Sequence, residues 1–464
     1  MWYTITDFIL KGMAFITIPI FTRLLSVEEY GIVSVYTTFV GIFAIITGID
    51  LHASIGTGIN DFKEKKKEFL SSVLFLSLLS FISVFIIIYI FRELLSNVFN
   101  IESNILIFSV ISGYFAFIFN YYITIKVFEK NYKVKSLLSL LKAISTVILS
   151  IILVIIIKNN KYFGRIYGEL IVGIIISTIL FFLILAKGKK IIWIKAWKYS
   201  MLIGVPLILH NLSGIILSQF DRLAIQKIIG SEKVGLYSYA YTLGMIPLII
   251  LGATNLAWVP WFYDKMYENK KEEIFKKVKY YNEIFLLLLL LMFIIIPELG
   301  IIMAPKNYST SLIILPIIIA SYYMQFLYTI YVNFAFFYKK TGSISFGTLL
   351  AGIINIVLNI WLIPIFGYEI AAITTLISYI FLLLFHGINV LYNLNDKTIT
   401  PKYILGFAFL IISFSLIQYI ISKYFGMFSI TERISRILIF GSVGAIVGIK
   451  IYKKSKNLFK GDFI

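Results

Sequence analysis

The sequence predicts an all-α integral membrane protein of about 14 transmembrane helices, and its composition and patterning carry this prediction. Hydrophobic residues make up 60% of the 464 residues and charged residues only 14%. Soluble domains are nearer half apolar and a quarter charged. The apolar runs are continuous and reach the roughly 20 residues that a helix needs to cross about 30 Å of hydrocarbon. A membrane barrel would instead show short alternating strands.

The expected spans follow one another with short connections, so no extramembrane domain is expected to carry chemistry. The first span is long, lacks a basic leading segment and ends without a small-residue cleavage site, so we expect a retained helix. The spans lie near residues 3–24, 30–57, 69–91, 104–125, 136–157, 166–186, 200–221, 234–262, 281–303, 309–336, 342–363, 367–391, 403–422 and 437–452.

The net charge of +19 predicts topology rather than a nucleic-acid partner. About 28 of the Lys and Arg residues fall in one set of alternate connections, and roughly 12 fall in the other set. Cytoplasmic loops of membrane proteins retain the positive charge. Both termini are therefore expected to face the cytoplasm, and no nucleic acid is expected to bind.

A short connector after the first span recurs in the middle of the chain. At an offset of about 204 residues, the segment 23–31 has a loose copy in 228–236, so that Glu28 corresponds to Glu232 and Gly31 to Gly235. Such a repeat, in which each half has an even number of spans, predicts two related bundles in parallel orientation.

The repeat sets the expected domain boundaries. A weaker echo, between residues 128–131 and 337–340, supports the same register. We expect a six-helix bundle over residues 1–190, a second pseudo-symmetric six-helix bundle over 191–395, and two additional helices with a basic tail over 396–464.

Three groups of segments follow one another along the chain: Thr22–Gly31, then Asp221–Ile225 with Val234–Tyr241, and then Asn355–Gly367 with Ala371–Thr375. In this order they resemble the polysaccharide-biosynthesis transporters, the Wzx-type flippases. The resemblance covers most of residues 1–392 and is looser beyond them. The chain departs from the usual Gly-Ala-Ala after an Ile-Pro turn, where Glu369–Ala372 stands.

The resemblance implies a fold like that of the MATE multidrug antiporters and lipid II flippases of the same MOP superfamily. It implies that an undecaprenyl-diphosphate oligosaccharide is moved between leaflets of a prokaryotic cytoplasmic membrane, for O-antigen, capsule or teichuronic-type polysaccharide. The implied partners are membrane lipid and, in the same pathway, a polysaccharide polymerase and a chain-length regulator. In such a cycle two helix bundles alternate access to a cationic central cavity.

Four cations within or at the ends of spans are the expected ligands of the diphosphate: Arg23, Arg222, Lys11 and Lys142. An ionisable group inside a span is costly unless it faces a cavity or a partner, and a guanidinium suits phosphate oxygens. Three of them have a structural alternative. Arg23 can anchor to lipid headgroups, Lys11 can pair with Asp7 four residues earlier, and Lys142 can extend to the membrane surface.

Three carboxylates are the candidate ion-coupling groups: Asp7, Asp50 and Asp221. His52 follows Asp50 closely, and an imidazole titrates near neutrality, so coupling to H⁺ or Na⁺ is one interpretation of this pair. The alternative is that the second span ends there and leaves both side chains among the headgroups.

The sequence carries no recognised catalytic motif. It has no Cys, no P-loop and no His-Glu-x-x-His, and its three His lie in different spans. No catalytic residue, cofactor or metal ligand is therefore expected, and the protein is predicted not to be an enzyme. Two rival functions remain: a MATE-like cation-coupled drug antiporter, which would need an anionic cavity, and a membrane enzyme that polymerises lipid-linked sugars.

Overall fold

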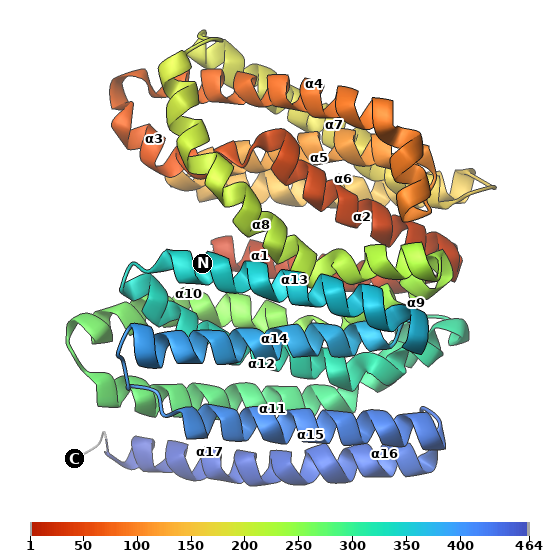
Figure 1. The fold of residues 1–464 in the computed structure, drawn as a ribbon, viewed down its shortest axis with the longest axis vertical. Coiled ribbons are helices and arrows are strands. Elements are labelled where there is room, and N and C mark those ends of the chain that lie inside the picture. Colours follow the sequence, from red (N-terminus) through yellow and green to blue (C-terminus); the bar gives the residue numbers. More distant parts are fainter. Residues whose placement is uncertain (1, 462–464) are drawn as a thin grey trace. The chain divides into compact units, whose positions relative to one another are not determined.

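The computed structural model describes the backbone of residues 2–461, and the side chains of all of these except residues 2–5, 7, 8, 11, 14 and 454–461. Within residues 2–461 the chain forms helices and no strand (Figure 1). Thirteen of the helices are long and apolar enough to cross a membrane, and a shorter apolar stretch, Phe15–Leu24, lies in the first helix. The predicted all-α membrane architecture is thereby confirmed.

The chain forms two compact units, Met1–Gly235 and Leu236–Ile464. The helix that runs from Ile194 to Ile228 therefore belongs to the first unit. The boundaries predicted at residues 190 and 395 describe the sequence repeat, which this division by contacts does not test, and they stay a prediction.

The first unit contains seven long helices, several short ones and the start of α9. They are α1 (Trp2–Leu24), α2 (Val27–Gly48), η1 (Leu51–Ser54), α3 (Ile55–Asp61), η2 (Lys63–Lys65), α4 (Lys66–Phe99), α5 (Ser103–Phe128), α6 (Tyr132–Ile156), α7 (Tyr162–Gly188), α8 (Ile194–Ile228) and α9 (Ser231–Gly244).

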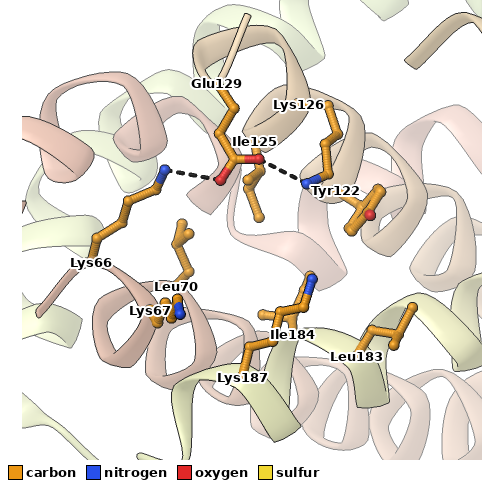
Figure 2. Close-up of a pocket in the computed structure, with 10 residues that line it drawn as sticks. All are labelled: Lys66, Lys67, Leu70, Tyr122, Ile125, Lys126, Glu129, Leu183, Ile184 and Lys187. Atoms are coloured by element: carbon orange, nitrogen blue, oxygen red, sulfur yellow. Dashed lines mark hydrogen bonds and ion pairs between the residues drawn. The ribbon is translucent and has the colours of Figure 1, made fainter. Parts of the chain in front are cut away.

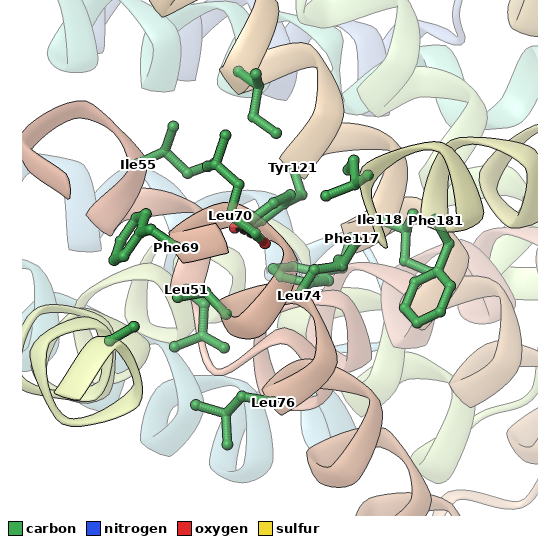
Figure 3. Packing of buried hydrophobic residues seen from close by; sticks show 14 of the residues in the cluster. Leu51, Ile55, Phe69, Leu70, Leu74, Leu76, Phe117, Ile118, Tyr121 and Phe181 are labelled. Carbon is green, nitrogen blue, oxygen red and sulfur yellow. Dashed lines mark hydrogen bonds between the residues drawn. The ribbon is translucent and has the colours of Figure 1, made fainter. Parts of the chain in front are cut away.

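The core of the first unit lies where α4, α5 and α7 meet the turn after α2 (Figure 3). Leu51 and Ile55 of this turn are fully buried against Phe69, Phe117 and Tyr121. The turn is thus held by large aromatic side chains, and its apolar residues Leu51 and Ile55 lie inside the protein.

Local sequence explains where α2 begins. Ser26 accepts a hydrogen bond from the Glu29 N–H at 3.1 Å, and the Glu29 carboxylate accepts one from the Ser26 N–H at 2.9 Å. This reciprocal capping box satisfies two amide groups that a helix start leaves unpaired. The connector between α1 and α2 is therefore a tight, fixed turn.

The second unit contains the remaining helices. They are α10 (Ile246–Tyr267), α11 (Lys271–Met303), η3 (Lys306–Ile314), α12 (Leu315–Phe337), α13 (Thr341–Phe366), α14 (Ile370–Ile388), η4 (Asn389–Asn393), α15 (Pro401–Phe425), α16 (Ile430–Arg436), η5 (Ile437–Gly441) and α17 (Ser442–Gly461).

Helix α12 is the central helix of the second unit, because it packs against α10, α11, α14 and α15 and most of it is buried. A ladder of buried polar side chains joins α13 to α14. Asn359 donates to Asn355 at 3.0 Å and accepts from Thr374 at 2.6 Å, and Asn355 donates to Thr375 at 3.3 Å. Such hydrogen bonds hold helices together where lipid offers no hydrophobic drive.

The C-terminal helices are attached to the second unit by small residues and ion pairs. Gly444 of α17 packs against Leu290 of α11. Glu298 of α11 lies 3.0 Å from Arg433 and 2.5 Å from Arg436. The small-residue face of the last helix therefore packs within the protein's own second unit.

The departure from the family pattern at residue 369 has a structural role. The Glu369 carboxylate accepts a hydrogen bond from Tyr419 of α15 at 2.7 Å and lies 3.3 Å from the Lys423 ammonium. The acid in this departing segment thus joins the turn between α13 and α14 to α15.

Candidate functional site

Helix α2 ends in an unusual backbone conformation inside the protein. Ile49 and Asp50 both have positive φ angles, of 47° and 51°. This left-handed region is strongly disfavoured for a β-branched residue such as Ile49, so the surroundings must enforce it. Helix α8 supplies part of that constraint, because a Cβ on Gly204 would lie only 2.4 Å from the Ile49 carbonyl oxygen.

A buried carboxylate lies at this break in the helix, the left-handed turn at Ile49 and Asp50. Asp50 is 1% exposed. Its Oδ1 lies 3.2 Å from the His52 Nδ1, and its Oδ2 accepts a hydrogen bond from the Asn211 side chain of α8. A charge buried in this way needs such partners. Asp50, His52 and Asn211 therefore form a buried polar centre between the segment after α2 and α8.

Helix α8 is docked against the break at further positions. The hydroxyl of Ser54, just after the break, donates to Ser200 of α8 at 2.9 Å. The indole of Trp197 donates to the Ser72 carbonyl oxygen of α4 at 2.9 Å. Because α8 supplies both Gly204 and Asn211, the geometry of the buried carboxylate depends on where this helix lies.

A second charged group lies deep in the same unit. Helix α6 begins at Tyr132, earlier than the predicted span start, so Lys142 is farther from the helix end than expected. Its ammonium lies 4.2 Å from the centre of the Phe119 ring, and the Glu169 carboxylate of α7 is the charge that acts on it. Lys142 is partly buried within the bundle.

Close packing of α6 and α7 brings these groups together. A Cβ on Gly168 would lie 2.3 Å from the Ser150 hydroxyl, so only glycine permits this approach. Arg165 donates to the Ser150 hydroxyl at 2.9 Å rather than pairing with Glu169. Glu169 is thereby left to act on Lys142.

The two arginines proposed from the sequence both belong to the first unit. Arg23 is exposed at the end of α1, where its guanidinium donates to the Pro19 carbonyl oxygen at 2.9 Å. Asp221 is fully buried and Arg222 is partly buried, and α8 continues beyond both to Ile228. Arg222 thus lies within a helix rather than at its end.

The remaining two predicted residues, Asp7 and Lys11, lie in α1, but their side chains fall outside the described residues. The structure therefore places their backbone only.

The repeated connectors contact each other, and all four residues that make this contact lie in the first unit. A Cβ on Gly31 would lie 1.9 Å from the Ser231 carbonyl oxygen, and one on Gly235 would lie 2.0 Å from the Val27 carbonyl oxygen. The offset of about 204 residues pairs Val27 with Ser231 and Gly31 with Gly235. The contact is reciprocal, so each copy of the connector supplies a glycine to the backbone of the other.

The sequence analysis missed the buried carboxylates of the second unit, Glu283, Asp396 and Glu432. Glu283 of α11 is 2% exposed, and its Oε1 lies 2.8 Å from the Lys450 ammonium of α17. The charged residue near the start of a long apolar helix was the available signal. Its partner is more than 160 residues away in the sequence, so the pair was not visible there.

Comparison with known proteins places this architecture in a family. The family model described as polysaccharide biosynthesis protein matches residues 1–266, more than half of the chain. The chain belongs to this family. The resemblance inferred from the connector motifs is thereby confirmed, and the protein is a multi-pass membrane protein of the transporter type.

Relatives and solved structures agree with this assignment. A protein of the Lsg locus of Haemophilus influenzae is 23% identical over 363 residues, which cover 76% of this chain and 88% of that protein. The lipid II flippase MurJ in an inward closed conformation has a TM-score of 0.67 at 17% identity, covering 97% of this chain and 99% of MurJ. An inward-facing MATE multidrug transporter of the MOP superfamily has a TM-score of 0.61 at 14% identity, covering 85% and 99%. At these identities the solved structures establish a shared fold.

Proposed function

We propose that this protein flips undecaprenyl-diphosphate-linked oligosaccharide repeat units across the cytoplasmic membrane for surface polysaccharide synthesis. Membership of the polysaccharide biosynthesis family is the observation that carries the proposal. The shared fold with a lipid II flippase supports it, because that protein also handles a lipid-linked substrate. Both termini are proposed to face the cytoplasm, since the connections on that side are the basic ones. The glycan belongs to an O-antigen, capsule or teichuronic-type pathway, with a polymerase and a chain-length regulator as partners.

The diphosphate is proposed to bind cations of the first unit. Arg23, Arg222, Lys11 and Lys142 are the groups that the sequence offers for this role. A guanidinium makes paired hydrogen bonds to phosphate oxygens, and a partly buried ammonium such as Lys142 attracts anions more strongly than an exposed one. Alternating access of the two bundles to a cationic cavity remains the mechanism predicted from the sequence.

Gene deletion and charge reversal test the transport function. Deletion is expected to leave lipid-linked sugar in the inner leaflet and to abolish surface polysaccharide. The Arg23→Glu, Arg222→Glu double variant should fail to restore it while the purified protein unfolds at the wild-type temperature. Arg92→Glu, at a partly exposed arginine of the same unit, is the control and should restore it fully. Unchanged polysaccharide after deletion would disprove the proposal.

The buried centre at Asp50 is the proposed site of coupling to H⁺. Its carboxylate has an imidazole and an amide as partners, so gain of a proton would change its interaction with α8. In liposomes containing the purified protein, an imposed pH gradient should accelerate flipping by the wild type but not by Asp50→Asn. Asp264→Asn, an exposed carboxylate, should keep the acceleration. Asp7 and Asp221 are the other candidates, and an unaltered response in Asp50→Asn would redirect the search to them.

A MATE-like drug antiporter is the second candidate, because the buried Asp50 carboxylate could attract a cationic drug. Cells that express the protein should show no increase in resistance to cationic dyes if the flippase proposal is correct.

A further inference from the structure

A pocket lined by lysines lies where α4 begins and where α5 and α7 end (Figure 2). Its volume is about 360 Å³. It opens at the end of the helices that the charge distribution predicts to be cytoplasmic. The lining residues are Lys66, Lys67, Leu70, Tyr122, Ile125, Lys126, Glu129, Leu183, Ile184 and Lys187.

The positive charge of this pocket is only partly neutralised. Glu129 accepts hydrogen bonds from Lys66 at 2.9 Å and from Lys126 at 2.7 Å, so one carboxylate serves two ammonium groups. Lys67 and Lys187 lie on the opposite side of the pocket (Figure 2), and no ion pair joins either to a carboxylate among the described side chains. Four cations therefore face one anion.

Helix stabilisation explains two of these lysines but not the other two. Lys126 and Lys187 lie in the last turns of α5 and α7, where a cation stabilises the helix dipole. Lys66 and Lys67 lie in the first turn of α4, where a cation opposes the dipole and an anion is favoured.

The walls of the pocket suit a lipid. Leu70, Ile125 and Ile184 form part of the buried core of the unit, so the floor is apolar and fixed. Leu183 is 43% exposed and continues this apolar surface outward. An acyl chain could lie along Leu183 while the headgroup occupies the charged part.

The frame of the pocket is also held by hydrogen bonds. Ser71 of α4 donates to the Lys190 carbonyl oxygen beyond α7 at 2.8 Å, and Tyr121 of α5 donates to the Leu70 carbonyl oxygen at 3.0 Å. The three helix ends are therefore fastened to one another without a ligand. A preformed site loses less entropy when it binds.

We propose that this pocket binds the phosphate headgroup of an anionic phospholipid from the membrane leaflet beside it. Lys67 and Lys187 contact the phosphate directly, and Lys66 and Lys126 exchange part of their contact with Glu129 for it. The excess of three positive charges favours a headgroup with two phosphates, such as cardiolipin, over one with a single phosphate. Basic pockets between membrane helices on the cytoplasmic side commonly bind such headgroups. The site is separate from the substrate cations and does not depend on the proposed transport function.

Lipid binding by the purified full-length protein tests this directly. Cardiolipin, phosphatidylglycerol and phosphatidylcholine are titrated into the detergent-solubilised protein, and bound lipid is counted by native mass spectrometry. The wild type should prefer cardiolipin, then phosphatidylglycerol. The Lys67→Gln, Lys187→Gln double variant should bind cardiolipin roughly thirty-fold more weakly, because each lysine contributes about a factor of five.

The matched control is the Lys63→Gln, Lys65→Gln double variant, which removes the same charge from exposed lysines of the neighbouring segment outside this pocket. It should keep the wild-type affinity within about two-fold. Equal losses in both double variants would overturn the proposal, since the effect would then be one of overall charge. Lack of preference for anionic lipid in the wild type would also overturn it.

Competition by undecaprenyl diphosphate separates a phospholipid site from a substrate site. Under the proposal this compound leaves cardiolipin bound at the pocket. If instead it binds there more tightly than cardiolipin and displaces it, the pocket belongs to the substrate path and the proposal is wrong. Because binding is measured without transport, failure of this proposal and failure of the flippase proposal are independent results.

Discussion

Each unit has a place where one long helix begins beside the ends of others, and we call this place its corner. The two corners occupy related positions in the sequence repeat but differ in charge. In the first unit, the start of α4 and the ends of α5 and α7 surround an open pocket with four lysines and Glu129. In the second unit, the start of α11 brings Lys271 to the end of α12, where Tyr338 and the segment after α14 meet it. The weaker repeat echo relates these two corners.

The second corner is closed by a single buried carboxylate. Asp396 has a fully buried side chain, which lies 3.0 Å from the Lys271 ammonium and accepts hydrogen bonds from the Tyr338 hydroxyl at 2.8 Å and the Thr398 N–H at 2.9 Å. Burial alone would raise the pKa of Asp396, but these hydrogen bonds outweigh it and hold the pKa below its usual value. The first of these places thus holds an open pocket lined by lysines, and the second holds an ion pair whose carboxylate is buried.

The largest effect on stability is expected at the two connectors, where each copy packs a glycine against the backbone of the other. Gly31→Ala and Gly235→Ala each place a methyl group about 2 Å from a backbone oxygen of the other connector. Overpacking of this kind should cost about 3 kcal/mol and lower the unfolding temperature by roughly 6–12 °C in both variants. Gly214→Ala, where no atom lies within 4 Å, is the control and should unfold at nearly the wild-type temperature. A large effect of only one substitution would disprove the reciprocity.

The next effect belongs to the closed corner. Asp396→Asn removes a buried charge on which Lys271, Tyr338 and Thr398 converge. This should cost about 2–3 kcal/mol, because the Lys271 ammonium loses its ion pair and the new amide NH2 replaces one acceptor oxygen with a donor. Thermal unfolding of the purified protein measures this, with the exposed Asp264→Asn as control. Because the pKa of Asp396 is lowered, its contribution is present above the ordinary Asp value of 3.8 and is lost only as the pH falls below it. If the Asp396→Asn protein were as stable as the wild type, the buried carboxylate would not stabilise this corner, and the contrast between the two corners would be wrong.

Adding a carboxylate to the lysine pocket of the first unit is expected to change stability less than Asp396→Asn does, but to weaken cardiolipin binding clearly. Lys187→Glu adds a second carboxylate to the lysine pocket and should weaken cardiolipin binding roughly thirty-fold, since the local charge changes by two. Lys63→Glu changes the total charge equally outside the pocket and should alter binding by less than about two-fold. Native mass spectrometry measures both, and equal losses would contradict the assignment of the pocket.

The smallest effect is expected for the carboxylate of the open corner. The hydrogen bonds and charges of Lys126 and Lys66 overcome the effect of burial, so the pKa of Glu129 is lowered. Glu129→Gln should cost less than about 1 kcal/mol, because this ion pair is partly exposed, while cardiolipin binding should tighten a few-fold. The stability that Glu129 contributes is present at neutral pH and is lost as the pH falls below 4.5, its ordinary value. Weaker lipid binding by Glu129→Gln would show that the acid positions the lysines instead of competing with the phosphate.

Much of the candidate site could be named from the sequence, but its partners could not. Asp50 and His52 stand two residues apart, and their proximity follows from that spacing. Asn211, which completes the centre, lies 161 residues from Asp50, and only the packing of α8 brings it there. The lysine pocket was visible only as part of a topology signal, because its four cations come from three helices.

Some structural roles were hidden within recognisable motifs. Asn355, Asn359 and Thr374 were noted as family residues, and the structure gives their physical role as a buried hydrogen-bond ladder between two helices. Glu369 was a departure from the family pattern, and it proves to hold the C-terminal helices.

The sequence by itself determined that this protein is a duplicated bundle of membrane helices of the polysaccharide biosynthesis family. Hydropathy and motif spacing are local properties of the sequence. The length of an apolar run is therefore enough to predict a membrane span, and the spacing of similar segments is enough to predict a repeat. Tertiary structure alone decided which charges are buried, which are neutralised and which remain available. The reason is that pairs such as Lys271 with Asp396 form between segments 125 residues apart, and only the packing of the helices fixes such distances.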